Sequence, residues 1–175
     1  MFSDPAKNIE QLELTRNMIV ADLGAGSGAY TLAAARKIKG GEGKVYAIEV
    51  QRDLLKRIED AAHKEHLNNI DYIWGNIEKR GGTKIHDKTV DCAIASNVLF
   101  QVEDQKGFLD EIKRILKPQG KLLLIDWTDS FGGMGPAAGQ VVNATKAESL
   151  LAAIGFTKVK TIDAGAHHYG ILFTL

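Results

Sequence analysis

The chain of 175 residues is 45% hydrophobic and 25% charged, which is ordinary for one soluble globular domain spanning residues 1–175. Its 22 basic side chains balance its 22 acidic ones, so the broad basic surface of a nucleic-acid-binding protein is missing and no nucleic-acid partner is expected. The single cysteine, Cys92, excludes an internal disulfide and a cysteine-rich metal site, and no metal is expected.

The beginning of the chain is polar and lacks the apolar core of a signal peptide. No apolar run in the sequence approaches the ~20 residues that span a bilayer. We therefore expect a cytoplasmic protein with no membrane partner.

Short runs rich in β-branched residues alternate along the chain with segments of helical periodicity. The expected strands cover residues 18–23, 44–49, 70–74, 90–96, 121–126, 157–163 and 169–174. Several are apolar at nearly every position, which is typical of parallel strands covered on both faces. This alternation predicts a doubly wound, Rossmann-like α/β fold in a single domain, with a mainly parallel seven-stranded sheet. The last two strands, which no helix separates, predict a C-terminal antiparallel hairpin.

The first helices are marked by a cap and by apolar spacing. Asp4 followed by Pro5 predicts a short N-terminal helix within residues 1–16. Apolar residues three and four positions apart predict helices over 51–66 and 105–116.

The last helix is predicted from its two ends. Thr145 with Glu148 three residues later has the spacing of a capping box, and Gly155 is a typical closing residue. Because open α/β sheets bind ligands outside the carboxyl ends of their parallel strands, the loops at that edge are the expected functional site.

A glycine-rich loop follows the first strand directly, with the sequence DLGAGSG at residues 22–28. Glycines allow positive φ and a close approach of a ligand to the backbone, and the helix that follows offers free N–H groups at its start. Glu49 closes the second strand about 20 residues further on, a spacing that suits a carboxylate accepting hydrogen bonds from the hydroxyls of a ribose. The pattern predicts a nucleoside-containing ligand.

Two ligand classes share this pattern. Gly24, Gly26 and Ala29 also fit the relaxed dinucleotide fingerprint, so an NAD-binding oxidoreductase is the rival hypothesis. Asp22 argues against it, because a charge two residues before the first glycine suits a ligand with an ammonium group better than a pyrophosphate. The chain is also short for a dehydrogenase with a separate substrate domain.

Four motifs in this order resemble those of the class I S-adenosylmethionine-dependent methyltransferases, nearest the ubiquinone/menaquinone-biosynthesis-type branch. They are DLGAGSG at 22–28, GNI at 75–77, VDCAIASN at 90–97 and LKPQGKLLLID at 116–126. The resemblance is strong over residues 17–126 and rests on topology alone afterwards. It implies S-adenosylmethionine as the cofactor.

The resemblance also implies a set of cofactor-binding residues. They are Asp22, Gly24, Ala25, Gly26, Gly28, Glu49, Val50, Asn76, Ile77 and Asn97. By that resemblance, backbone at the glycines packs against the methionine and ribose, Asp22 takes the methionine ammonium and Glu49 holds the ribose hydroxyls. For Glu49, the alternative is a polar residue that caps its loop.

On the adenine side, the resemblance implies that Val50 and Ile77 sandwich the base. Asn76 stands where family members commonly have an aspartate that contacts the adenine amino group, and an amide oxygen can accept the same hydrogen bond. Asn97 is implied at the methionine and substrate side, with a loop-capping role as the alternative.

The family supplies no universal catalytic residue, so candidates follow from position. Asp126 ends the fifth strand at the ligand edge, and the loop 164–169 brings His167 and His168 to the same rim. A histidine can act as a base for a hydroxyl or acidic carbon nucleophile. The alternative is a polar hairpin tip in solvent, and one of the two histidines is expected to point outward.

The glycine-rich stretch 128–142 between the fifth strand and the last helix predicts either a mobile lid or an ordinary flexible loop. As a lid, it offers Phe131 and Met134 as substrate contacts.

The substrate class follows in part from a missing motif. After the fourth strand the sequence is SNVL at 96–99, without the Asn/Asp-Pro-Pro-aromatic element of relatives that methylate nitrogens in nucleic acid or glutamine. We therefore expect in-line transfer of a methyl group to carbon, oxygen or nitrogen of a small molecule, with a protein side chain as the alternative. The acceptor atom and the oligomeric state stay open.

Overall fold

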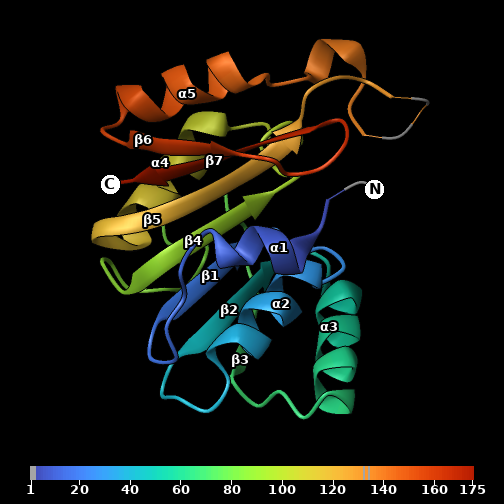
Figure 1. Ribbon diagram of the computed structural model, residues 1–175, viewed down its shortest axis with the longest axis vertical. Helices are drawn as coiled ribbons and strands as arrows, with labels where there is room; N and C mark the ends of the chain where they lie inside the picture. The colour runs from blue at the N-terminus through green and yellow to red at the C-terminus, as the bar shows by residue number, and fades with distance from the viewer. Residues whose placement is uncertain (1–2, 132, 134) are drawn as a thin grey trace.

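The computed structural model describes residues 3–131, 133 and 135–175. Within this part of the chain, one seven-stranded sheet has the strand order β3-β2-β1-β4-β5-β7-β6 (Figure 1). Its strands are β1 (Ile19–Leu23), β2 (Lys44–Glu49), β3 (Ile70–Trp74), β4 (Val90–Ser96), β5 (Leu116–Trp127), β6 (Thr157–Ile162) and β7 (His168–Thr174). The first five strands are parallel, and β7 runs antiparallel to both β5 and β6. The predicted doubly wound sheet with its C-terminal hairpin is confirmed.

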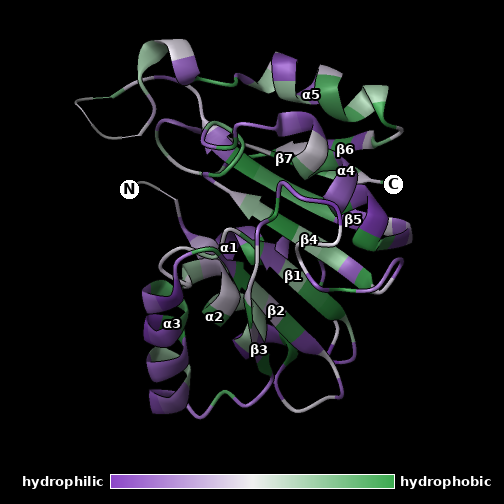
Figure 2. Ribbon diagram, turned by 180° about the vertical axis from the view of Figure 1, so that it is seen from behind, coloured by the Kyte–Doolittle hydropathy of each residue, from purple (hydrophilic) through white to green (hydrophobic). Residues whose placement is uncertain are grey.

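Helices cover both faces of the sheet and form a three-layer α/β/α arrangement. They are α1 (Pro5–Glu10), α2 (Ala29–Ile38), α3 (Arg52–Lys64), α4 (Gln105–Ile115) and α5 (Ala144–Ala153), with a short 3₁₀ turn at Ala138–Gln140. Buried residues of α1, α2 and α3 form one hydrophobic cluster with one face of the strands, and those of α4 and α5 form a second cluster with the other face. Figure 2 shows the largely hydrophobic central strands between these layers.

Caps and apolar stripes explain where these helices begin. The Asp4 side chain accepts a hydrogen bond from the backbone N–H of Lys7, and Pro5 occupies the first helical position of α1, as predicted. The side chain of Asp104 caps α4 in the same way. Phe108 and Ile112, on the stripe predicted for this helix, are fully buried.

The predicted cap of α5 is wrong. The helix begins at Ala144, and the Asn143 side chain accepts from the N–H of Lys146 at 2.9 Å. Asn143 is as good a cap as a threonine and comes two residues earlier, so Thr145 lies inside the first turn. Gly155, with φ of +97° and its N–H bonded to the carbonyl of Ala152, closes the helix as expected.

The strand β5 begins at Leu116, well before the predicted start at 121. Leu116 pairs with Val90 of β4, and an irregularity between Val90 and Cys92 shifts the register ahead of the regular pairing of Cys92 with Lys121. The polar stretch in between hid this pairing from the hydrophobic pattern.

The strand order reverses between β1 and β4, because β2 and β3 lie on one side of β1 and β4 and β5 on the other. The carboxyl ends of β1, β2, β4 and β5 therefore frame a crevice at one edge of the sheet, where open α/β sheets bind their ligands.

Candidate active site

The glycine loop is anchored to the sheet and closely packed. The N–H of Gly24 donates to the carbonyl of Ile48 at 2.9 Å, which ties the end of β1 to β2. Gly24 has φ of +74°, and a Cβ there would lie 2.7 Å from Val98; Gly28 has φ of +81°, and a Cβ there would lie 2.6 Å from Ile58 of α3. Both the backbone conformation and the space therefore require glycine at these two positions.

Glu49 links the glycine loop to the start of α3. Its side chain is buried, and Oε2 accepts the N–H of Gly26 at 3.0 Å. Oε1 accepts the N–H groups of Val50 at 2.9 Å and Gln51 at 3.1 Å. A carboxylate can accept about four hydrogen bonds, two on each oxygen. The Glu49 carboxylate accepts three from the backbone, so the remaining site lies on Oε2.

Asp22 is a second buried carboxylate, only 2% exposed, on the other side of the loop. Burial raises its pKa to about 6, although the hydroxyl of Thr31, which donates to Oδ2 at 2.6 Å, opposes this shift. The nearby charge of Glu49 adds a smaller upward contribution to the pKa. A buried acid of this kind favours a cationic partner.

Two cavities flank the glycine loop and meet at Gly24, Gly26 and Gln101. The first has a volume of about 500 Å³ and contains, among the predicted cofactor residues, Asp22, Gly24, Ala25, Gly26 and Asn97. The second has a volume of about 610 Å³ and contains Glu49, Val50, Asn76 and Ile77. Gly28 lines neither cavity, because it packs under α3.

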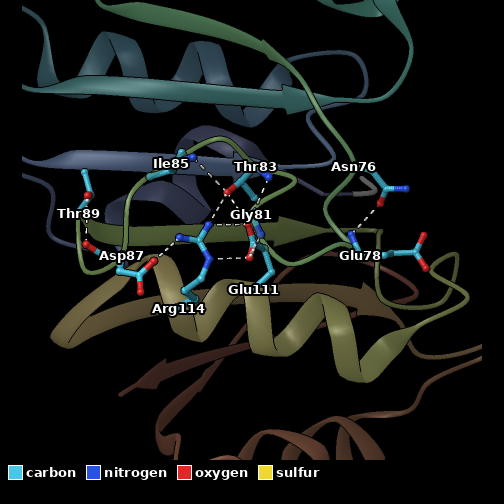
Figure 3. A network of polar contacts seen from close by, with 9 residues as sticks. All are labelled: Asn76, Glu78, Gly81, Thr83, Ile85, Asp87, Thr89, Glu111 and Arg114. Carbon is cyan, nitrogen blue, oxygen red and sulfur yellow. Dashed lines mark hydrogen bonds and ion pairs between the residues drawn. The ribbon is translucent and has the colours of Figure 1, made fainter.

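In the second cavity, the side chain of Val50 is 53% exposed and that of Ile77 is buried. The Oδ1 atom of Asn76 accepts the N–H of Glu78 at 2.8 Å (Figure 3). The amide oxygen expected to contact a ligand thus already holds a backbone hydrogen bond, and the amide nitrogen points away from that bond.

The loop between β3 and β4, which carries Asn76 and Ile77, is held by a buried ion pair that sequence reasoning missed. Glu111 of α4 accepts hydrogen bonds from Gly81 and Thr83 of this loop and pairs with Arg114 at 2.7 Å (Figure 3). Burial raises the pKa of Glu111, but Arg114 and the loop donors outweigh it and lower the value to about 2.

A signal for this ion pair existed in the sequence. Glu111 falls three positions after Phe108 and four before Ile115, within the apolar stripe of its helix, where an unpaired charge is costly.

Asn97 lies in the first cavity in a strained backbone conformation, with φ of +58°. Its N–H donates to the carbonyl of Ile125 at 2.8 Å, and its carbonyl accepts from Gln101. Its buried Oδ1 atom accepts no hydrogen bond from the described residues.

Side chains alternate between the two faces of the sheet along each strand, and this alternation places the candidate bases Asp126 and His168 on opposite faces. Asp126 points to the same face as Leu124 and Tyr169, away from the face of Asp22, and lines neither of the two cavities. Its carboxylate accepts the N–H groups of Trp127 at 2.8 Å and Phe100 at 3.3 Å. Burial raises its pKa to about 6.

His168 and Trp127 lie on the opposite face and line the first cavity together. The Nδ1–H of His168 donates to the carbonyl of Ala166 at 2.8 Å, so a neutral ring carries its lone pair on Nε2. The ring centroids of His168 and Trp127 are 4.4 Å apart.

His167 does not line this cavity. Its Nδ1 atom lies 3.0 Å from Asp129, and its ring stacks on Phe131 with centroids 3.8 Å apart. Both contacts join the hairpin loop to the glycine-rich stretch 128–142. Met134, the other expected substrate contact, lies outside the described residues.

Sequence reasoning also missed part of the lining of the first cavity, namely Ser3, Pro5, Tyr30 and Gln101.

Across the described part of the chain, no helix has the length and apolarity needed to cross a bilayer. Nor do the described His, Cys, Asp and Glu side chains form a group of three that could hold a metal ion.

Comparisons with known proteins indicate the family of the chain. The family model described as a methyltransferase domain matches residues 21–124. The ubiquinone/menaquinone biosynthesis C-methyltransferase UbiE of Pectobacterium atrosepticum is 31% identical over 121 residues, covering 69% of this chain and 47% of that protein. The highly reducing polyketide synthase verA of Penicillium polonicum is 28% identical over 180 residues, covering 89% of this chain but 7% of that protein. The chain thus spans less than half the length of these curated relatives.

Among solved structures, the crystal structure of a SAM-dependent methyltransferase from Aquifex aeolicus superimposes with a TM-score of 0.87 at 26% identity, covering 99% of this chain and 90% of that one. The match is therefore to nearly the whole described fold, including the C-terminal hairpin. The family model alone covers more than half of the chain. The chain belongs to the methyltransferase domain family, within the class I S-adenosylmethionine-dependent methyltransferases.

Proposed function

We propose that this domain transfers a methyl group from S-adenosylmethionine to a small-molecule acceptor. The observation that carries the proposal is the position of two buried carboxylates, Asp22 and Glu49, on either side of one glycine loop and in two cavities that meet there. S-adenosylmethionine supplies an electrophilic methyl group on a positively charged sulfur. The chain supplies alignment, exclusion of water and a place for a proton.

The two carboxylates recognise opposite ends of the cofactor. Asp22 binds the methionine ammonium, which compensates the cost of burying the ionised acid. Glu49 accepts a ribose hydroxyl on the open site of Oε2, while its three backbone hydrogen bonds hold it in place. Gly24, Ala25 and Gly26 pack under the ribose and methionine, and Gly28 serves by allowing α3 to approach.

The second cavity takes the adenine ring between Val50 and Ile77. Asn76 contacts the edge of the base. Its amide nitrogen is the group that makes this contact, because its Oδ1 atom already accepts the backbone N–H of Glu78. On the other side, Asn97 faces the methionine and the acceptor, where its buried Oδ1 can accept a hydrogen bond from a ligand.

The acceptor binds in the first cavity between Trp127, Gln101 and His168. Bound S-adenosylmethionine would supply the methyl group to the acceptor atom, and His168, which lines the same cavity, would take the acceptor's proton on Nε2. The carbonyl of Ala166 stabilises the resulting imidazolium through Nδ1–H. We assign Asp126 and His167 to positioning: Asp126 braces the loop after β4, and His167 fastens the stretch 128–142 through Asp129.

We also propose that residues 128–131, 133 and 135–142, the described part of the stretch 128–142, close the acceptor side as a lid. A Cβ at Gly135 would lie 2.6 Å from the indole of Trp127, so backbone packs directly on that ring. The N–H of Thr128 donates to the carbonyl of His167 at 2.9 Å. Exclusion of water by such a segment favours transfer to the acceptor.

The name of the Pectobacterium relative, a C-methyltransferase of quinone biosynthesis, supports a small-molecule acceptor. The balanced charge of the chain supports an enzyme without nucleic-acid or membrane partners. Transfer of a labelled methyl group distinguishes the acceptor classes: the protein is incubated with labelled S-adenosylmethionine and either a metabolite extract or denatured cell protein. We expect label in small molecules; label only in protein would favour a side-chain methyltransferase.

A further inference from the structure

Three polar side chains at the edge of the first cavity form a closed hydrogen-bonded triangle. The Nδ2 atom of Asn8 donates to Ser3 Oγ at 3.0 Å and to the hydroxyl of Tyr30 at 2.9 Å. The two hydroxyl oxygens are 2.5 Å apart. Asn8 is 1% exposed, whereas Ser3 and Tyr30 both line the cavity. The triangle thus joins the segment around α1 to the first turn of α2 at the cavity wall.

The hydrogens of this triangle can be counted. The amide of Asn8 uses both of its hydrogens, one toward Ser3 and one toward Tyr30. Of the two hydroxyl hydrogens, one lies between the two oxygens, whichever oxygen donates it. One O–H hydrogen is therefore left over, on either Ser3 or Tyr30, and both of these residues face the cavity.

The surroundings indicate which ligand group this donor meets. The described residues that line the first cavity include no lysine or arginine, and apart from His168 the side chains and backbone there offer an anionic group only neutral donors. The backbone N–H groups at the start of α2, at Ala29 and Tyr30, provide a favourable potential for such a group. Thr31, the next residue, holds Asp22 at 2.6 Å, so a site for a cation lies beside this donor.

We propose that the Ser3 and Tyr30 hydroxyl pair donates its remaining hydrogen to the carboxylate of the cofactor's amino-acid end. This inference rests on the proposed function, in which Asp22 binds the ammonium. An α-amino acid carries its ammonium and carboxylate on the same carbon, so a partner for one requires a partner for the other close by. The segment that contains Ser3 and α1 is then part of the cofactor site as well as a cover of α2.

The geometry makes the two hydroxyls interchangeable. In Tyr30→Phe, Ser3 still accepts from Asn8 and its own hydrogen is released toward the cavity. In Ser3→Ala, Tyr30 still accepts from Asn8 and donates its hydrogen to the ligand. Only the double variant removes the donor, so the effects of the two substitutions are strongly non-additive.

The test uses calorimetric titration with two probes, S-adenosylhomocysteine and its decarboxylated analogue, which keeps the ammonium but lacks the carboxylate. The measured quantity is the ratio of their dissociation constants. We expect the wild type to prefer S-adenosylhomocysteine by tenfold or more, on the order of a hydrogen bond to a charged group plus the helix N-terminus. The single variants keep most of this ratio, and the double variant loses about tenfold, through weaker binding of S-adenosylhomocysteine alone.

A ratio that survives in the double variant, or is lost fully in either single variant, overturns the proposal. Equal weakening of both probes also overturns it, because the hydroxyls then only hold α1 in place. If neither probe binds the wild type, the proposed function itself fails. Tyr72→Phe, on a half-buried ring outside the two cavities, is the matched control.

Folding of the double variant is checked by its thermal unfolding midpoint. If the variant does not fold, adding Asn8→Leu replaces the remaining buried amide by an apolar group, so that no buried donor is left without a partner. The same loss of ratio is expected in this triple variant.

Discussion

The carboxylate of Glu49 accepts the backbone N–H of Gly26 at 3.0 Å, so the acid at the end of β2 is bound to the glycine loop at the end of β1. Together with the N–H groups of Val50 and Gln51, this bond fixes the carboxylate before any ligand arrives. A fixed acceptor costs little entropy when a ribose hydroxyl binds to it.

Replacing this carboxylate tests its role in binding. In Glu49→Ala, the ribose loses its charged acceptor and the N–H of Gly26 loses its partner, so we expect affinity for S-adenosylhomocysteine to fall at least about tenfold in calorimetry. Glu59→Ala on the outer side of α3, which removes only a surface pair with Lys56, should leave the affinity within about twofold. An affinity within that range for Glu49→Ala counts against the assignment.

The buried acid Asp22 predicts a pH dependence of binding. Burial raises its pKa to about 6 in the free protein, so the carboxylate becomes protonated as the pH falls below that value. A bound ammonium requires the ionised form, and affinity for S-adenosylhomocysteine should therefore fall by about tenfold between pH 7.5 and pH 5. In Asp22→Asn the affinity should be low and nearly independent of pH. If this variant kept the wild-type dependence of affinity on pH, the pairing of Asp22 with an ammonium would be contradicted.

The proposed base predicts a change in rate without a change in cofactor binding. His168→Asn should lower kcat by about a hundredfold or more while affinity for S-adenosylhomocysteine is retained. His63→Asn, on the exposed side of α3, is the control. A variant with full activity would show that no proton passes to His168.

The buried pair of Glu111 and Arg114 predicts the strongest effect on stability. Glu111→Gln removes the buried charge partner of Arg114 and leaves its guanidinium paired only with the exposed Asp87, which we expect to cost about 2 kcal/mol in the free energy of unfolding measured with urea at pH 7. Asp60→Asn, which breaks an exposed pair with Lys56, should cost less than about 1 kcal/mol.

The same pair has a pH signature with a definite sign. The folded-state pKa of Glu111 is lowered to about 2 from its usual 4.5, so its stabilisation is fully present above pH 4.5 and is lost as the pH falls toward 2. The difference in unfolding free energy between wild type and Glu111→Gln should therefore shrink over that range. A constant difference would contradict the ion pair.

The sequence predicts the sheet and the cofactor side of the site because both depend on local patterns. Apolar strands, the glycine loop and the acids at the ends of β1 and β2 each follow from a few neighbouring residues, and parallel topology brings them to one edge. The face to which Asp126 points could not be predicted in this way. Its position at a strand end follows from the local sequence, but its face depends on the strand register, which the loop sequences do not reveal.

Contacts between distant segments explain what the sequence did not predict. Ser3 meets Tyr30 across 27 positions, and Glu111 meets Thr83 across 28. Neither pair has a spacing that an isolated helix or strand would produce. Each depends on how a helix packs on the sheet, which follows from the summed burial of many apolar side chains.

Calorimetric titration of the wild-type protein with S-adenosylmethionine, S-adenosylhomocysteine and NAD in parallel tests the central claim most directly. We predict saturable binding of the first two ligands at one site and no binding of NAD, because Asp22 disfavours a pyrophosphate beside the glycine loop. Binding of NAD without binding of either adenosyl ligand would contradict the account and favour an oxidoreductase.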